Sequence, residues 1–265
     1  MRPVAGCLAL VVAMVAACSS PSGNGQGPAA VDLTVYAAAS LKGALTAART
    51  AYAIATPSVS LTIATDSSST LCTQIEQGAP ADVFLSADES NPNRLVDAGL
   101  ADGAAIGFAG NTLVVIVPTA NPAGIASPAD LAGHGIKIIA AGAEVPITGY
   151  ATQAVTNLAN QPGYPAGFAA AYDANVVSNE DNVKAVVAKI ELGEGDAAIV
   201  YATDAKASKK VTTVEIPATA NVPATYAGVV VGASTQRDAA HGFLTWLAGP
   251  DGQAVLATFG FVPPS

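Results

Sequence analysis

The sequence predicts an α/β fold in which open, mostly parallel sheets are flanked by helices. Short apolar segments rich in β-branched residues alternate along the chain with segments of helical periodicity, and this alternation is typical of strand–helix–strand units. The chain has 265 residues, of which 51% are hydrophobic and 12% are charged. It can therefore bury a sizeable core, and its length favours two lobes or one large domain.

The folded body begins near residue 31, and its elements follow one another from there. Strands are expected where β-branched and other apolar residues run together, at 32–37, 60–64, 82–85, 112–117, 137–140, 175–177, 197–200, 213–216 and 227–231. Helices are expected where apolar residues recur every three or four positions, at 41–52, 69–77, 92–98, 150–158, 181–192, 237–248 and 251–258.

The N-terminal segment is predicted to be a signal peptide. Arg2 gives a positive start, an apolar run covers 4–17, and small residues precede Cys18. This pattern resembles a bacterial lipoprotein signal, which implies removal of residues 1–17 and lipid attachment at Cys18 on the extracytoplasmic face of the cell membrane. The alternatives are an ordinary secretory signal or a membrane anchor, although a spanning helix needs roughly 20 apolar residues. Residues 18–30 have the composition of a flexible tether.

Charge and metal-ligand content exclude several classes of function. The net charge is −9, and the densest basic spot is the pair Lys209-Lys210, so a nucleic-acid partner is not expected. The two histidines and three cysteines form no CxxC or HExxH motif, so neither a metal site nor a catalytic thiol is expected. Cys72 would be the only free thiol of the mature chain, and we expect it to be a small buried side chain.

Three predicted strands run directly into helix starts that carry hydroxyl or amide side chains. Ser40 follows strand 32–37, the run 67–69 of three serines follows strand 60–64, and 178–181 follows strand 175–177. Helix starts bring unpaired N–H groups and a partial positive charge to the carboxyl edge of a sheet, which is where α/β proteins bind anions. Helix capping alone explains a single serine such as Ser40. Three consecutive serines exceed what one cap requires, and they favour an anion site.

Five segments together resemble the molybdate-binding proteins that supply ABC importers. They are VYAAASLKGAL at 35–45, DSSSTLCTQIEQGAPADVFLSAD at 66–88, GNTLVVIVP at 110–118, NEDNVKAVVAKIELGEGDAAIVYATDA at 179–205 and GPDGQAVLATFGF at 249–261. The resemblance implies a type II periplasmic-binding-protein fold, with two α/β lobes, a hinge of two crossings and the ligand in the cleft between the lobes. Lobe one would comprise 31–110 plus 205–265, and lobe two would comprise 111–204.

The resemblance also implies which groups hold the ligand. The family binds its oxyanion with neutral donors, three from each lobe. At the matching positions of this chain, these donors are Ser40, Ser68 and the N–H of Ala87 in lobe one, and the N–H of Ile147, the N–H of Val183 and the phenol of Tyr201 in lobe two. Without the resemblance, Tyr201 would be read as a core or rim aromatic residue.

Two positions depart from the family pattern. Ile147 stands where the family has a small residue, so the backbone donor is kept while the volume of the cleft changes. Asp66 stands where the family has an uncharged residue. Because a carboxylate facing a dianion would repel it, we expect Asp66 to point to solvent or to cap the following helix.

These observations predict an extracytoplasmic solute-binding protein for molybdate, and also for tungstate, that delivers its ligand to the membrane subunits of an ABC permease. Both anions are dianions whose four oxygens only accept hydrogen bonds, so a site made of donors suits them. Phosphate, which retains a proton, would benefit from an acceptor. The alternative ligand is sulfate or another tetrahedral oxyanion, whereas ferric iron would call for paired tyrosines. We expect a monomer that contains no cofactor. A serine hydrolase is disfavoured because neither GxSxG nor SxxK occurs.

Overall fold

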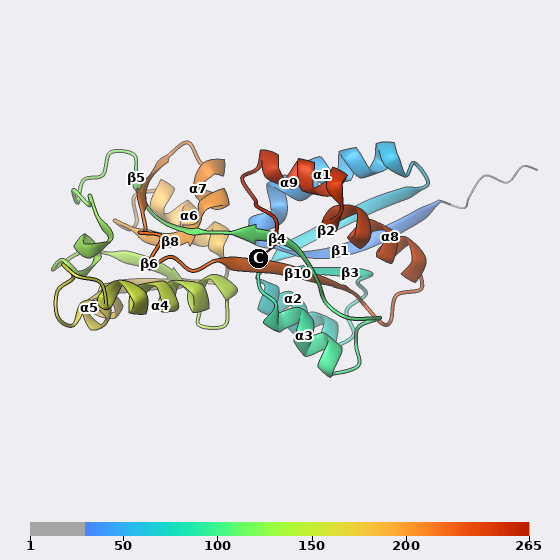
Figure 1. Cartoon of the computed structure of the whole chain (residues 1–265), viewed down its shortest axis with the longest axis horizontal. Helices are drawn as coiled ribbons and strands as arrows, with labels where there is room; N and C mark the ends of the chain where they lie inside the picture. The colour runs from blue at the N-terminus through green and yellow to red at the C-terminus, as the bar shows by residue number, and fades with distance from the viewer. Residues whose placement is uncertain (1–29, 265) are drawn as a thin grey trace, which may run out of the picture.

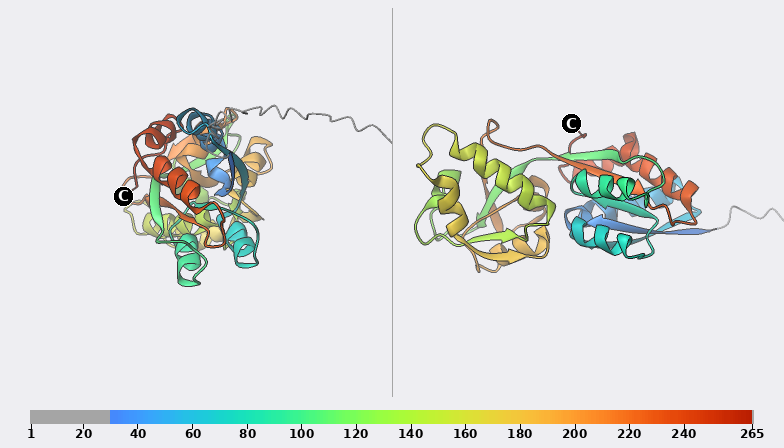
Figure 2. Two further views of the ribbon diagram at one scale, coloured as in Figure 1. Left: turned by 90° about the vertical axis from the view of Figure 1, so that its right-hand side faces the viewer. Right: turned by 90° about the horizontal axis from the view of Figure 1, so that it is seen from below.

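The computed structural model describes residues 30–264 as two α/β lobes that follow one another along the long axis of the molecule (Figure 1). The predicted signal peptide, Cys18 and most of the predicted tether lie outside the described residues. Each lobe is built around its own sheet, and Figure 2 shows the two lobes end to end along the long axis of the molecule. The α/β class predicted from strand–helix alternation is therefore confirmed.

The first lobe contains a five-stranded sheet in the order β2-β1-β3-β10-β4. Its strands are β1 (Val31–Ala38), β2 (Val59–Asp66), β3 (Val83–Ser86), β4 (Ile106–Asn111) and β10 (Ala224–Val230). The first three are parallel, while β10 runs antiparallel to both of its neighbours. The carboxyl ends of β1, β2 and β3 therefore meet at one edge of the sheet.

Helices cover both faces of this sheet. They are α1 (Lys42–Ala55), α8 (Arg237–Ala248) and α9 (Pro250–Thr258) on one face, and α2 (Ser68–Glu76) and α3 (Ser90–Asp97) on the other (Figure 1). Strand β3 shows why both faces must be covered. Val83 and Leu85 belong to the large core, whereas Phe84 packs with the cluster under α2 and α3. Successive side chains of a strand point to opposite faces, so a continuous apolar strand needs a layer on each side.

The second lobe contains a smaller mixed sheet. Strand β5 (Leu113–Pro118) pairs with β8 (Ala198–Tyr201) and β9 (Val211–Glu215), and β6 (Ile138–Ala141) pairs in parallel with β7 (Val176–Glu180). A bridge between Ile138 and Ala197 joins the two sets. The helical segments of this lobe are η2 (Pro128–Ala132), α4 (Pro146–Ala159), α5 (Phe168–Ala174), α6 (Val183–Glu191) and α7 (Ala202–Ala207).

The chain crosses twice between the lobes. The first crossing joins β4 to β5 and the second joins β9 to β10, and the side chain of Asn221 links them because it accepts from Leu113 N–H at 3.0 Å and donates to Leu113 C=O at 2.8 Å. We expected the return to lobe one at residue 205. Strand β9 instead pairs with β5 of the second sheet, so the return lies between Glu215 and Ala224.

Besides the short helical segments, one strand and two α-helices of the described residues were absent from the sequence-based expectation: β4, α5 and α7. Strand β4 contains two glycines in six residues, and the helices have seven and six residues, so none shows a full apolar period. In addition, α4 begins at Pro146 rather than at residue 150. Among residues 30–264, no helix has both the length and the apolar character needed to cross a membrane.

Candidate functional site

The six residues predicted to hold a ligand line a single pocket between the lobes. Ser40, Ser68 and Ala87 come from the first lobe, and Ile147, Val183 and Tyr201 come from the second. The rest of the wall is formed by Ala38, Ala39, Asp66, Ser67, Val145, Pro146 and Asn182. Side chains that are up to 163 positions apart in the sequence therefore meet in one small space.

Ser40 lies in the short helical turn η1 (Ala39–Leu41), directly after β1. The apolar strand β1 places this turn at the carboxyl edge of the first sheet, and Ser40 is buried there with 7% of its surface exposed. Its Oγ lies 2.9 Å from the Oη of Tyr226, and either hydroxyl can be the donor. The serine is thus held in place by a buried tyrosine of β10.

Ser68 and Ala87 contact each other at the ends of neighbouring strands. Ser68 opens α2 after β2, and Ala87 follows β3. The Ala87 N–H donates to Ser68 Oγ at 3.0 Å. A hydroxyl that accepts one hydrogen bond still has its own proton to donate. Ser68 can therefore donate to a group in the pocket while Ala87 holds its oxygen.

The second lobe presents two helix starts to the pocket. Helix α4 begins at Pro146 and α6 begins at Val183, with Asn182 as the N-cap whose side chain accepts from Ala185 N–H at 3.1 Å. The first N–H groups of a helix have no partner within the helix and carry a partial positive charge. Ile147 and Val183 lie in these first turns, so their N–H groups suit an anion. Proline at the first position is compatible with a helix start because its missing N–H is not needed there.

Tyr201 ends β8, with 1% of its surface exposed. Within the described part of the chain, its hydroxyl has no hydrogen-bond partner. Burial raises the pKa of Tyr201 well above its ordinary value, and the nearby Tyr226 raises it further, so the phenol stays protonated and can donate. A buried hydroxyl without a partner costs about 1–3 kcal/mol. A hydrogen-bond acceptor in the pocket would remove that cost.

Two further polar side chains line the pocket beside Ser68. Ser67 is 3% exposed, and no residue in 30–264 hydrogen bonds to its hydroxyl. The Oδ1 of Asp66 accepts from Ser67 N–H at 2.8 Å and from Asn182 Nδ2 at 3.2 Å. The expectation that Asp66 points to solvent or caps the helix was therefore wrong, because the carboxylate bridges the two lobes and Ser67 is the N-cap residue of α2. A helix cap can be predicted from neighbouring residues in the sequence. The partner of Asp66 could not be predicted in this way, because Asn182 belongs to the opposite lobe.

The lobes are in direct contact around this pocket. Besides the Asp66–Asn182 bond, Ser69 Oγ donates to the carbonyl of Glu144 in the second lobe. About 10 Å³ of the pocket is open to the centre of a water-sized sphere, which is about the room that one water molecule needs. No lysine or arginine is among the described residues that line it. The polar groups of the lining therefore suit an anion held by neutral donors.

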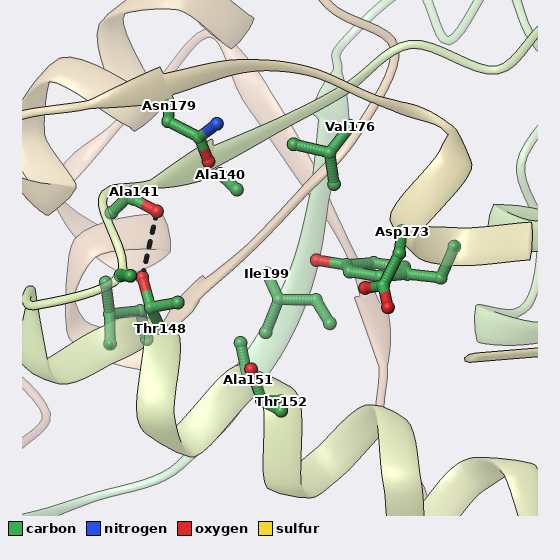
Figure 3. A pocket seen from close by; sticks show the side chains of 12 residues that line it. Ala140, Ala141, Thr148, Ala151, Thr152, Asp173, Val176, Asn179 and Ile199 are labelled. Carbon is green, nitrogen blue, oxygen red and sulfur yellow. Dashed lines mark hydrogen bonds between the residues drawn. The ribbon is translucent and has the colours of Figure 1, made fainter. Parts of the chain in front are cut away.

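A larger hollow lies inside the second lobe, and Ile147 lines both spaces. Figure 3 shows that its labelled side chains are mainly alanine, valine, isoleucine and threonine, with the Thr148 hydroxyl 3.0 Å from the carbonyl oxygen of Ala141. About 230 Å³ of it is open to the centre of a water-sized sphere. Because its walls are mostly apolar and Thr148 already donates to backbone oxygens, this hollow does not suit an oxyanion.

The histidines and the free thiol lie outside the inter-lobe pocket. Cys72 is fully buried, and burial raises the pKa of its thiol to about 11, which confirms the expected packing role. His241 lies on α8, and its Nε2 is 3.2 Å from Asp102 Oδ2. Over residues 30–264, no group of three or more His, Cys, Asp or Glu side chains is arranged to hold a metal ion.

Comparison with known proteins identifies the family. Residues 33–262 match the model of the bacterial extracellular solute-binding protein family. This chain belongs to that family. The solute-binding protein is 35% identical over 263 residues to the molybdate-binding protein ModA of Mycobacterium tuberculosis, which covers 97% of the chain and 95% of the relative. It is 31% identical to a Bacillus subtilis protein described as a putative ABC transporter substrate-binding lipoprotein, over 94% of the chain and 93% of that protein.

A solved structure gives the same result for the fold of this solute-binding protein. The periplasmic molybdate-binding protein of Azotobacter vinelandii superposes with a TM-score of 0.74 at 26% identity, over 88% of the chain and all of that structure. The predicted type II arrangement, with two lobes and a cleft between them, is thereby confirmed.

Proposed function

We propose that this protein binds molybdate, and also tungstate, in the pocket between its lobes and delivers the anion to the membrane subunits of an ABC importer. The observation that carries the proposal is that the six residues matched to the family's donors, three from each lobe, line one buried pocket, in a chain 35% identical to a molybdate-binding protein. Molybdate and tungstate accept at all four oxygens, so each donor has an acceptor. Closure of two lobes around a ligand is the usual signal in hinged binding proteins.

The assignment of the donors is part of this proposal. Ser40, Ser68 and Tyr201 would donate through hydroxyls, and Ile147 and Val183 through backbone N–H groups. The Ala87 N–H, which donates to Ser68 Oγ, would orient that serine toward the anion. A hydrogen bond to an ionised partner contributes about 1.5–3 kcal/mol. Several such bonds suffice for tight binding after desolvation and closure, so no positive side chain is required. The protein then performs no chemistry, and the anion leaves unchanged.

Calorimetric titration of the chain from residue 19 onward tests the ligand. We expect submicromolar binding of molybdate and tungstate and weak or no binding of sulfate and phosphate. Sulfate binding of equal or greater strength would reassign the pocket to sulfate, because both anions have the same charge and shape and only the size of the cavity separates them. Failure of all four anions to bind would overturn the proposal.

Ser68→Ala tests the site itself. The variant loses the donor to the ligand and the group that holds Ala87 N–H, so the dissociation constant for molybdate should rise at least about tenfold. Ser60→Ala is the matched control, because Ser60 lies on β2 of the same lobe and is exposed. Unchanged affinity in Ser68→Ala, with the fold intact by circular dichroism, would remove Ser68 from the site.

We also propose that the protein is a monomer held at the extracytoplasmic face of the cell membrane by lipid on Cys18. The sequence pattern before Cys18 supports this, as does similarity to a protein described as a substrate-binding lipoprotein. The mass of the N-terminal peptide from membrane-purified protein tests the anchor. A diacylglyceryl cysteine at position 18 is expected, and an unmodified N-terminus elsewhere would contradict it. Light scattering of the soluble chain tests the monomer.

A further inference from the structure

Tyr226 lies behind the pocket rather than in its wall. It belongs to β10, the first strand after the second crossing, and it is fully buried. Its ring packs against those of Tyr201 at 5.5 Å, Phe261 at 5.3 Å and Phe108 at 6.3 Å between centroids. It is not among the residues that line the pocket. Its hydroxyl nevertheless contacts Ser40, one of the residues that do.

The side-chain amide of Asn111 determines the direction of the hydrogen bonds around Tyr226. Its Oδ1 accepts from Thr112 N–H at 3.0 Å. Its Nδ2 therefore faces the opposite way, where it lies 2.8 Å from Thr203 Oγ1 and 3.4 Å from Tyr226 Oη. An amide nitrogen only donates. Tyr226 Oη accepts from Asn111, and the single proton of Tyr226 remains for Ser40.

An oxyanion bound in the pocket would fix the direction of the remaining hydrogen bonds in this row. Because such an anion only accepts, the Ser40 hydroxyl must donate to it, and Ser40 Oγ is then free to accept from Tyr226. Asn111 then donates to Tyr226, Tyr226 donates to Ser40, and Ser40 donates to the anion. Hydrogen bonds arranged head to tail in a buried site polarise and strengthen one another.

We propose that Tyr226 is a positioning residue that points the proton of Ser40 at the bound anion. Asn111 sets the direction from the first crossing, since it ends β4. Thr203 belongs to α7 of the second lobe, so the network spans both crossings and both lobes. This inference rests on the proposed function in that Ser40 is taken to bind the anion.

The protonation state of Tyr226 is compatible with this role. Burial raises the pKa of Tyr226 well above its ordinary value, and the carboxylate of Asp204 raises it further. The phenol therefore keeps its proton throughout the neutral range. Tyr226→Phe would remove the hydroxyl alone and leave the packed ring in place.

A double-mutant cycle tests the proposal by calorimetry with molybdate. Tyr226→Phe should raise the dissociation constant about fivefold, which corresponds to one neutral hydrogen bond. In a Ser40→Ala background the same substitution should have no effect, because the group that Tyr226 orients is gone. Tyr52→Phe is the matched control, because Tyr52 is a buried tyrosine of the same lobe that packs on Phe243 and Trp246. Removal of the Tyr52 hydroxyl should leave the affinity for molybdate unchanged.

The outcomes separate this inference from the proposed function. If the unsubstituted protein binds none of the four anions, the proposed function fails. If it binds molybdate and Tyr226→Phe binds equally well, the inference alone is overturned. An equal loss in the presence and absence of Ser40 would also overturn it, because Tyr226 would then act through something other than Ser40. Should Tyr226→Phe fail to fold, Asn111→Ala enters the same cycle, and additive losses with Ser40→Ala would contradict the proposal.

Discussion

The two lobes differ in whether the hydroxyls that they present to the pocket already have hydrogen-bond partners. In the first lobe, Ser40 is held by Tyr226 and Ser68 is held by Ala87 N–H. In the second lobe, no described residue hydrogen bonds to the hydroxyl of Tyr201. The first-lobe donors are thus oriented by contacts within their own lobe, whereas Tyr201 needs an acceptor from outside. Ser67 departs from this pattern, since its buried hydroxyl also lacks a partner within residues 30–264.

This difference indicates how ligand binding and closure are coupled. A surface whose donors are already oriented can receive an anion with little rearrangement. A buried hydroxyl that lacks a partner makes the closed form without ligand less stable, by about 1–3 kcal/mol. Ligand binding removes that penalty, so it shifts the population toward the closed form. If the protein binds its ligand as proposed, the hydroxyls of Tyr201 and Ser67 would both make closure depend on the ligand.

The largest expected effect concerns the ion pair behind the second-lobe donors. Lys184 Nζ lies 2.6 Å from Asp204 Oδ1, and the Asp204 side chain is fully buried. Lys184→Met would leave that carboxylate unpaired, so the free energy of unfolding at pH 7 should fall by about 3 kcal/mol. Chemical denaturation measures this. Lys189→Met, which breaks the more exposed pair with Glu180, is the control and should cost at most about 1 kcal/mol.

The pH dependence of that loss gives it a second test. Burial raises the pKa of Asp204, and Lys184 opposes the rise. A carboxyl whose folded pKa is raised destabilises the fold fully above its folded pKa, and this penalty disappears as the pH falls to its unfolded pKa. The deficit of Lys184→Met should therefore shrink as the pH falls from 7 toward 4. A deficit that stays constant over this range would mean that lost packing, rather than the unpaired carboxylate, is the cause.

Tyr201→Phe tests the second-lobe donor directly and should have the next largest effect. The dissociation constant for molybdate should rise about tenfold to a hundredfold, because a hydrogen bond to an anion is lost. The unliganded protein should be at least as stable as before, since the hydroxyl has no described partner to lose. Titration and thermal unfolding together measure both. Reduced stability with unchanged affinity would show that the hydroxyl serves the fold and not the ligand.

Asp66→Ala should have the smallest effect, with a change in affinity below about threefold. Two contributions oppose each other: removal of a negative charge favours the anion, and loss of the bond to Asn182 weakens the contact between the lobes. Titration at low and high salt separates them, because the charge effect is screened and the bond is not. A tenfold change in either direction would contradict this balance.

The part of the site that local sequence predicted is the serine run that contains Ser68, because it follows an apolar strand and precedes a helix. Ser40 and Tyr201 were predicted through the family resemblance, since local sequence alone reads them as a helix cap and as a core or rim aromatic residue. The start of α4 could not be predicted in the same way. Its first turn, Pro146–Gly149, lacks apolar periodicity, so residue 150 was expected as the start. Proline at the first position was the available signal.

Long-range pairings explain the remaining differences. Strand β4 is glycine-rich, and it forms because β10 pairs with it and because Gly110 exchanges hydrogen bonds with Val262. We expected the second crossing too early in the chain because the local sequence of a strand such as β9 does not indicate which sheet it joins. Its partner β5 lies nearly a hundred positions earlier. The β-propensity of a segment does not indicate which distant strand will pair with it.

The sequence by itself determined the type of fold, the strand ends where donors gather and the neutral character of those donors, because these depend on periodicity and on residue type within a few positions. The tertiary structure decided which donors have partners. Ser40 meets Tyr226 across 186 positions, and Asp66 meets Asn182 across 116. Hydrogen bonds of this kind form only once the sheets and both crossings are in place, so the direction of the Ser40 proton and the bridge between the lobes are properties of the folded chain.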